Sequence, residues 1–161
     1  MFRVGIGYDV HRLCKGRKLF LGGVNIPSSR GLSGHSDADV LLHALCDALL
    51  GACAQKDIGE HFPDSHSAYK NISSIKLLKK VNSILKKLKY SIGNIDTVIV
   101  AERPRLGPFK AKMCRKIAKE LGISCGQVNV KATTTEGTGP IGRGEVISAY
   151  AVALIKKDAD L

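Results

Sequence analysis

The sequence contains no tryptophan, and its four tyrosines and four phenylalanines make up only 5% of 161 positions. So few aromatic side chains argue against a surface on which nucleic-acid bases stack. The chain also lacks any apolar run close to the roughly 20 residues that a membrane-spanning helix needs. Its first residues read as a strand instead of a secretory signal. These absences exclude a membrane-spanning protein and predict a chain that is not exported.

Acidic residues are scarce, because 14 Asp and Glu stand against 25 Lys and Arg, for a formal net charge of +11. This balance suits an anionic partner such as a phosphorylated metabolite, a nucleic acid or an acidic membrane surface. The charge alone does not choose among these three partners.

The five cysteines are odd in number, and no C-x-x-C pair occurs among them. A disulfide scaffold or a zinc ribbon is therefore disfavoured. Free thiols are typical of a reducing compartment, so we expect the protein in the cytoplasm.

Hydrophobic spacing predicts an α+β fold, with a single sheet of four to five strands covered by helices on one side. We expect one catalytic domain over residues 1–161. The expected strands lie at 2–8, 17–26, 95–101, 127–132 and 145–155, and the expected helices at 37–54, 73–89 and 108–121. Residues 27–36 and 55–72 read as loops, and a connection as long as the second is often functional.

A candidate metal centre begins at Asp9 and His11, just past the first expected strand. Residues two apart in an extended segment point to the same side, so these two side chains can hold one cation. His43 on the first helix would complete three ligands and leave a fourth position open, as in catalytic zinc sites. Asp47, one helical turn later, could accept a hydrogen bond from His43. The spacing alone favours a surface D-x-H pair and a buried core histidine over a metal site.

The start of the same helix is a candidate anion site. Ser36 stands where an N-cap is expected, and backbone N–H groups at a helix start favour an anion. His35 could add a donor there. Alternatively, Ser36 only caps the helix and His35 is a solvated loop residue.

A third cluster joins hydroxyls, a carboxylate and glycines. Thr133, Thr134 and Thr135 precede Glu136, and a glycine-rich loop at 137–144 carries Arg143. Such a segment can cradle phosphate, and Glu136 could hold Mg²⁺. The pattern is not a Walker A loop, and the threonines are also ordinary strand formers.

These segments together resemble the methylerythritol cyclodiphosphate synthase family of the non-mevalonate isoprenoid pathway. The resemblance rests on five stretches in order along the chain: G-Y-D-V-H at 7–11, G-H-S-D-A-D-V-L-L-H-A-L-C-D-A-L-L-G-A at 34–52, D-I-G-E-H-F-P-D at 57–64, V-K-A-T-T-T-E at 130–136 and G-R-G-E at 142–145. It implies a homotrimer whose sheets pack around a central axis, with active sites between subunits. The implied reaction converts 4-diphosphocytidyl-2-C-methyl-D-erythritol 2-phosphate to 2-C-methyl-D-erythritol 2,4-cyclodiphosphate and CMP, by attack of the 2-phosphate on the β-phosphate.

The resemblance also implies roles for individual residues. It gives zinc the ligands Asp9, His11 and His43, and it gives Glu136 to a second divalent cation, Mg²⁺ or Mn²⁺. His35 and Thr134 resemble the groups that stabilise the transition state.

The remaining residues that the resemblance implies bind the substrate. Those on the methylerythritol side are Ser36, Asp57, Ile58, Gly59, Phe62 and Asp64. Those of the cytidine pocket are Ala101, Pro104, Arg105, Leu106, Thr133 and Thr135. Arg143 resembles a phosphate-binding arginine that faces the trimer axis. Pro140 departs from the family pattern, because an aromatic residue is expected there.

Two other functions remain open from the residues themselves. One is a zinc-dependent hydrolase, in which Asp57, Asp64 or Glu136 would activate a metal-bound water. The other is an RNA-binding module built on the lysine faces of the helices at 73–89 and 108–121, although no RNA-binding signature occurs. We expect the cyclase, with no nucleic-acid partner and no membrane partner.

Overall fold

The computed structural model describes residues 1–63, 69 and 71–157. Its main sheet has five strands in the order β4-β1-β7-β5-β6, and every neighbouring pair is antiparallel except β5 and β6, which are parallel. The strands are β1 (Phe2–Cys14), β4 (Gly31–Leu32), β5 (Tyr90–Val100), β6 (Val128–Thr133) and β7 (Val146–Lys157). The prediction of a single sheet of four to five strands is confirmed.

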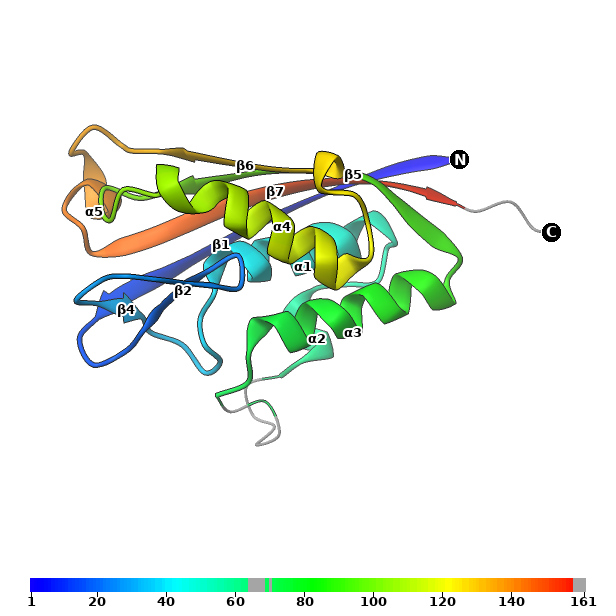
Figure 1. The fold of residues 1–161 in the computed structure, drawn as a ribbon. Helices are drawn as coiled ribbons and strands as arrows, with labels where there is room; N and C mark the ends of the chain where they lie inside the picture. The colour runs from blue at the N-terminus through cyan, green and yellow to red at the C-terminus, as the bar shows by residue number, and fades with distance from the viewer. Residues whose placement is uncertain (64–68, 70, 158–161) are drawn as a thin grey trace.

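The three long helices lie on one side of this sheet (Figure 1). They are α1 (Val40–Ala52), α3 (Ser74–Lys87) and α4 (Lys110–Leu121). Shorter elements are the separate β2–β3 hairpin (Leu19–Leu21, Val24–Ile26), α2 (Ile58–His61), α5 (Gly139–Gly142) and two 3-10 turns (Gly107–Phe109, Cys125–Gln127). The α+β class with helices on one side is thus also confirmed.

Several boundaries differ from the sequence prediction. The first strand does not end at residue 8, because β1 stays paired with β7 as far as Arg12 opposite Val146. Asp9 and His11 therefore lie within the strand. The segment 17–26 is a hairpin around Gly22 and Gly23, and β5 begins at Tyr90 instead of residue 95.

The first helix begins three residues later than predicted, and its N-cap is Asp39 instead of Ser36. The buried Asp39 carboxylate accepts hydrogen bonds from the Leu42, Gly22 and Gly23 backbone N–H groups. This one side chain therefore caps α1 and also ties the β2–β3 turn to it. Ser36 lies outside the helix and accepts a hydrogen bond from the Ala38 N–H.

Two glycines let α1 lie directly on β1. A Cβ placed on Gly5 would come within 2.0 Å of the Ala48 carbonyl oxygen, and one on Gly7 within 1.9 Å of the Ala44 carbonyl oxygen. No side chain fits in that space, so glycine is required at both positions. Because Asp9 follows Gly7 by two residues on the same face of the strand, it meets α1 at His43.

The opposite face of the sheet carries uncovered apolar side chains. Along β1, alternate residues are exposed, with Ile6 at 71% and Tyr8 at 48%. Tyr8 pairs with Tyr150 on β7, and their ring centroids lie 4.6 Å apart. The exposed large apolar side chains of β1 and β7 are Phe2, Val4, Ile6, Tyr8, Val10, Tyr150 and Val152.

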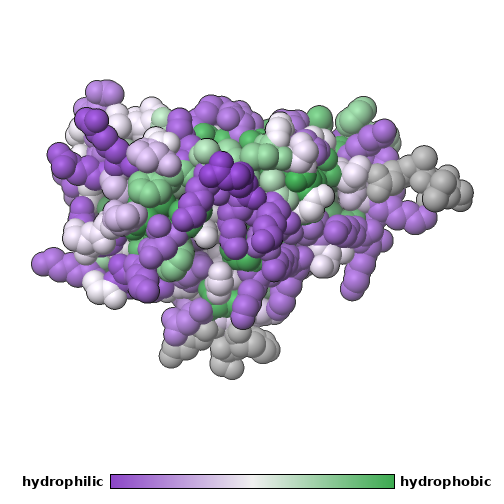
Figure 2. All heavy atoms as spheres, in the orientation of Figure 1, coloured by the Kyte–Doolittle hydropathy of each residue, from purple (hydrophilic) through white to green (hydrophobic). Residues whose placement is uncertain are grey.

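The helical side of the molecule is hydrophilic, as Figure 2 shows over α3 and α4. Lys79 on α3 and Lys116 on α4 both pair with Glu120, so part of this basic surface joins the two helices. None of the helices in the described part of the chain has the length and apolar character needed to cross a bilayer.

Candidate active site

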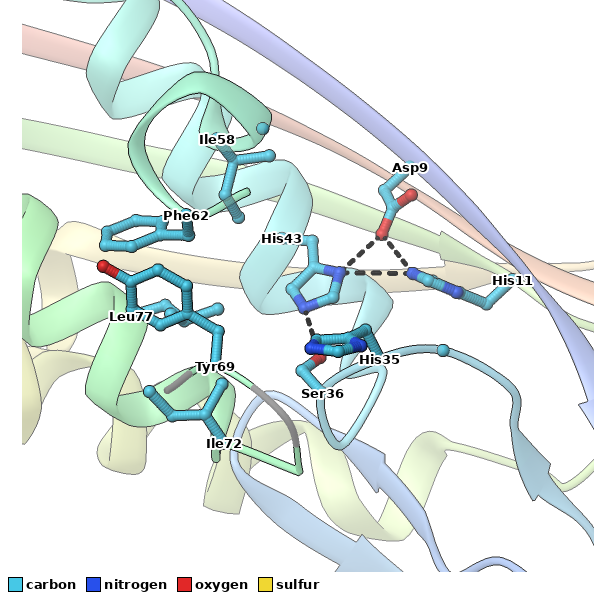
Figure 3. A pocket seen from close by; sticks show the side chains of 12 residues that line it. Asp9, His11, His35, Ser36, His43, Ile58, Phe62, Tyr69, Ile72 and Leu77 are labelled. Atoms are coloured by element: carbon cyan, nitrogen blue, oxygen red, sulfur yellow. Dashed lines mark hydrogen bonds and ion pairs between the residues drawn. The ribbon is translucent and has the colours of Figure 1, made fainter. Parts of the chain in front are cut away.

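Three side chains from two elements converge on one point. The Asp9 Oδ2 atom lies 2.9 Å from His11 Nε2 and 3.0 Å from His43 Nδ1, and the two ring nitrogens are 3.2 Å apart (Figure 3). Ligands of a tetrahedral zinc ion with bonds of 2.0–2.1 Å lie about 3.4 Å from one another. Two imidazole nitrogens and one carboxylate oxygen at this spacing fit zinc and leave a fourth position for a ligand. These residues are a candidate metal-binding group.

The electrostatics of this group suit a cation. Burial alone would raise the pKa of Asp9, but hydrogen bonds and charge from His11 and His43 hold that pKa well below its usual range. Burial alone would lower the pKa of His11, but the hydrogen bond and charge of Asp9 outweigh it and raise that pKa. An ionised carboxylate between two imidazoles suits a bound cation, and binding a metal requires the imidazole nitrogens without their protons.

The second ring nitrogen of each histidine, which faces away from Asp9, also has a hydrogen-bond partner. The His11 Nδ1 atom donates to the Ser33 carbonyl oxygen at 2.7 Å, which leaves Nε2 as the atom facing Asp9. The His43 Nε2 atom lies 3.1 Å from Ser36 Oγ and 2.9 Å from Ser74 Oγ. Ser33 and Ser74 are contacts that the sequence analysis missed, because nothing local in the sequence places either serine beside a histidine.

The hypothesis that Asp47 accepts a hydrogen bond from His43 is wrong. The Asp47 carboxylate accepts from the Ile58 N–H at 2.7 Å, because its side chain points to the start of α2. Burial is the main cause of its raised pKa, and the charge of Asp57 adds to it. Asp47 therefore holds the α2 segment in place.

The metal group forms one wall of a cavity of about 310 Å³. The cavity residues that the sequence singled out are Asp9, His11, His35, Ser36, His43, Ile58, Gly59 and Phe62. Tyr69, Ile72 and Leu77 form an apolar wall opposite (Figure 3). Sequence reasoning missed it, although Tyr69 and Ile72 are apolar residues in a polar loop and Leu77 is a buried residue of the predicted helix. Within the described residues, His35 Nε2 is buried without a hydrogen-bond partner, so it is available to a ligand.

The remaining residues of the methylerythritol side lie at the start of α2 or beyond it. Asp57 is the N-cap of α2 and accepts from the Glu60 N–H at 2.9 Å. It does not line the cavity, although Ile58 and Gly59 next to it do. Asp64 lies outside the described residues.

The residues expected around cytidine gather at a second cavity, of about 500 Å³. It lies where the parallel strands β5 and β6 end, and there the Ala101 N–H donates to the Thr133 carbonyl oxygen at 3.0 Å. Ligands commonly bind at the carboxyl ends of such strands. The expected residues that line it are Ala101, Pro104, Arg105, Leu106, Thr133 and Thr134. Among the described residues, none lines both this cavity and the metal cavity.

Besides Asp57, three expected site residues that the structure describes line neither of these two cavities. The Thr135 hydroxyl donates to the Thr138 carbonyl oxygen at 2.7 Å. The exposed Glu136 carboxylate accepts from the Thr134 hydroxyl at 2.9 Å. Arg143 pairs with Glu145 at 2.6 Å and is exposed.

The comparison with protein families decides the relationship. The model of the YgbB family matches residues 2–156 of the 161. The chain belongs to the YgbB family.

Relatives in this family are similar over nearly their whole length. The chain is 59% identical to the 2-C-methyl-D-erythritol 2,4-cyclodiphosphate synthase of Syntrophomonas wolfei, over 96% of this chain and 99% of that one. It is 57% identical to the enzyme of the same name from Syntrophotalea carbinolica, over 99% and 97%.

Solved YgbB-type structures share the fold. The bifunctional IspDF from Campylobacter jejuni matches with a TM-score of 0.95 at 40% identity, over 98% of this chain and only 43% of that longer one. A CDP complex of IspF from Plasmodium falciparum matches with a TM-score of 0.86 at 31% identity, over 98% and 97%.

Proposed function

We propose that this protein is a cyclising phosphorus–oxygen lyase. It converts 4-diphosphocytidyl-2-C-methyl-D-erythritol 2-phosphate to 2-C-methyl-D-erythritol 2,4-cyclodiphosphate and CMP. The observation that carries this proposal is 59% identity, over almost the whole of both chains, to a relative that bears the synthase name. The convergence of Asp9, His11 and His43 beside a cavity supports it independently.

The chemistry is an intramolecular phosphoryl transfer. A 2-phosphate oxygen bonds to the β-phosphorus, the bond from that phosphorus to the bridging oxygen breaks, and CMP leaves with that oxygen. Such a reaction needs positioning and neutralisation of charge more than covalent catalysis. The cavity of about 310 Å³ holds the reacting groups together and limits their access to water.

Side chains of the metal cavity would position the substrate and neutralise its charge. Asp9 Oδ2, His11 Nε2 and His43 Nδ1 would hold zinc, which when bound supplies a Lewis acid for a phosphoryl oxygen. His35 presents a buried nitrogen that has no hydrogen-bond partner among the described residues, and it donates to the transferring phosphoryl group. Ser36, Ile58, Gly59 and Phe62 hold the methylerythritol part, together with Asp57 and Asp64.

The nucleotide occupies the second cavity, at the ends of β5 and β6. The residues that surround the cytidine there are Ala101, Pro104, Arg105, Leu106 and Thr133. The Thr135 N–H donates to the Glu102 carboxylate, which holds the two segments of this cavity together. The description of one relative as a CDP complex supports a nucleotide ligand. The Thr134 hydroxyl, which donates to Glu136 at 2.9 Å, would turn to the phosphates once Glu136 holds Mg²⁺ or Mn²⁺.

The active protein is a homotrimer with its sites between subunits. The uncovered apolar face of β1 and β7 supports this assembly, because so many exposed large apolar side chains on one face mark an interaction surface. With these faces around a central axis, the metal cavity of one subunit meets the nucleotide cavity of its neighbour. Arg143 then faces the axial channel. The five free cysteines fit a cytoplasmic location.

The proposal is tested by release of CMP from the CDP-linked substrate. Demetallated protein should release none, zinc with Mg²⁺ should restore release, and Asp9→Asn should abolish it. Glu120→Gln is the matched control, since this carboxylate pairs with Lys79 and Lys116 on the helical side of the sheet and lines neither cavity. Release of CMP that survives demetallation would overturn the proposal.

A further inference from the structure

His43 faces two serine hydroxyls on the side away from Asp9. Ser74 Oγ lies 2.9 Å from His43 Nε2, and Ser36 Oγ lies 3.1 Å from the same atom. A hydroxyl can donate or accept, so neither contact alone decides which ring nitrogen of His43 carries the proton. The decision depends on what lies behind each hydroxyl.

A carboxylate lies behind Ser74. The Ser74 hydroxyl donates to Asp37 Oδ1, while Asp37 Oδ2 accepts from the Ser74 N–H at 3.0 Å. The Asp39 N–H also points at Asp37 Oδ1, at 3.3 Å. Asp37 is thus surrounded by donors and acts only as an acceptor.

The acceptor role of Asp37 fixes the direction of the hydrogen bonds that link His43, Ser74 and Asp37. Because the Ser74 proton is committed to Asp37, Ser74 Oγ has only lone pairs for His43. His43 Nε2 must then donate, which leaves the Nδ1 lone pair for a metal ion held together with Asp9 and His11. In the part of the chain that the structure describes, the Ser36 hydroxyl contacts no carboxylate and accepts from the Ala38 N–H at 3.0 Å, so it does not impose a direction.

We propose that Asp37 and Ser74 are positioning residues that hold His43 in the tautomer whose Nδ1 binds the metal. The inference rests on the metal centre of the proposed function and concerns how this chain prepares that centre. It corresponds to the carboxylate–histidine–metal arrangement in which an outer partner fixes the ring, with a serine hydroxyl inserted between carboxylate and imidazole.

Burial and backbone hydrogen bonds hold Asp37, Ser74 and His43 in position. Ser74 is fully buried and is the first residue of α3. The segment before it is joined to the segment of Asp37 by two backbone hydrogen bonds, Asp37 N–H to Ile72 O at 3.0 Å and Asn71 N–H to His35 O at 2.8 Å. The Asp37, Ser74 and His43 side chains are therefore held by backbone on both sides.

A purely structural role is the competing explanation. The N-cap residue Ser73 makes no side-chain capping bond, and Asp37 caps α3 in its place by accepting the Ser74 N–H. The two roles are separable, because Ser74→Ala keeps the backbone N–H and removes only the hydroxyl. Asp37→Asn keeps the shape but adds a donor, and its amide turns the Ser74 proton toward His43 Nε2.

The experiment compares these two variants with Ser83→Ala, which removes an exposed hydroxyl from the same helix. Zinc affinity is measured on demetallated protein by competition with a chelator. The state of the two His43 ring nitrogens is measured by nitrogen NMR of the imidazole on zinc-loaded protein, in which the metal-bound nitrogen and the protonated nitrogen are distinguished. Loss of an outer partner typically weakens metal binding by about 10–100-fold.

We expect that loss for Ser74→Ala and Asp37→Asn, and no change for Ser83→Ala. In the zinc-loaded unmodified protein Nε2 should carry the proton and Nδ1 the metal, and in Asp37→Asn the Nε2 proton should lose its hydrogen bond and exchange faster with water. Zinc affinity of Ser74→Ala within twofold of the unmodified protein would overturn the inference, as would a proton on Nδ1 in the unmodified protein. Tight zinc binding without cyclisation would refute the proposed function but leave this inference standing, whereas no zinc binding at all would overturn both.

Discussion

Gly7 on β1 lies against the backbone of Ala44 on α1, so closely that a Cβ on Gly7 would come within 1.9 Å of the Ala44 carbonyl oxygen. This contact sets the distance between the strand that carries Asp9 and His11 and the helix that carries His43. The metal group therefore depends on a residue that has no side chain and touches no ligand.

Gly7→Ala should push α1 away from β1 and separate the metal ligands. We expect a loss of about 1–3 kcal/mol in the free energy of unfolding, as for overpacked cores, together with weaker zinc binding. Gly51→Ala is the control, because nothing lies within 4 Å of a Cβ there. It should stabilise the helix by about 0.5–1 kcal/mol. Chemical denaturation and zinc titration of both variants check this, and normal zinc affinity in Gly7→Ala would contradict it.

The metal-free and zinc-loaded forms should respond to pH in opposite directions. The pKa of His11 is raised above 6.5, so its pairing with Asp9 stabilises the metal-free fold fully below pH 6.5. That contribution is lost as the pH rises through the folded-state value. The lowered pKa of Asp9 means that its own contribution is present above pH 3.8 and is lost as the pH falls through its folded-state value.

Zinc requires both imidazoles without their protons, so zinc affinity rises over the same range in which the metal-free protein loses stability. The gap in melting temperature between the two forms should therefore widen from about pH 5 to about pH 9. Thermal melts of both forms across this range measure it. A gap that stays constant would show that Asp9 and His11 do not exchange protons for the metal.

Ile6→Asp tests the uncovered face of the sheet. Ile6 is 71% exposed, so a charge there leaves the core of the subunit intact but opposes burial of this face against a neighbour. We expect a monomeric mass by light scattering, retained zinc binding and no CMP release, because the proposed sites lie between two subunits. Lys76→Asp, on the exposed side of α3, is the charge control and should remain trimeric. Full activity from a monomeric Ile6→Asp would refute sites between subunits.

Thr134→Ala should separate catalysis from metal binding. Its hydroxyl contacts Glu136 and borders the nucleotide cavity, away from the zinc ligands. Removing a donor to a developing negative charge costs a factor of about 10²–10³ in turnover. Single-turnover kinetics and zinc content should show that loss with one zinc ion retained per subunit. Turnover within a factor of two of the unmodified protein would remove Thr134 from the mechanism.

The sequence allowed some features of the site to be predicted and concealed others. Alternation along a strand places Asp9 and His11 on one side, which is a local rule. The approach of His43 depends on Gly5 and Gly7, whose role appears only when a helix packs on them. The resemblance to a family supplied this pairing, and the spacing did not.

The helix start was predicted wrongly for a related reason. Ser36 and Asp39 are both good N-caps by type, but Asp39 also accepts the N–H groups of Gly22 and Gly23, which come from a distant turn. Asp47 likewise follows Ile58 instead of His43, because α2 packs beside it. In each case a tertiary partner decided between local alternatives of similar energy.

The account's central claim is best tested by phosphorus NMR of the reaction products. Zinc-loaded protein with Mg²⁺ is given the CDP-linked methylerythritol 2-phosphate, and a sample with a zinc chelator runs beside it. We predict CMP and a cyclic diphosphate, with neither formed in the chelated sample. CMP with a linear methylerythritol product would show hydrolysis by water in place of attack by the 2-phosphate, and would contradict the account.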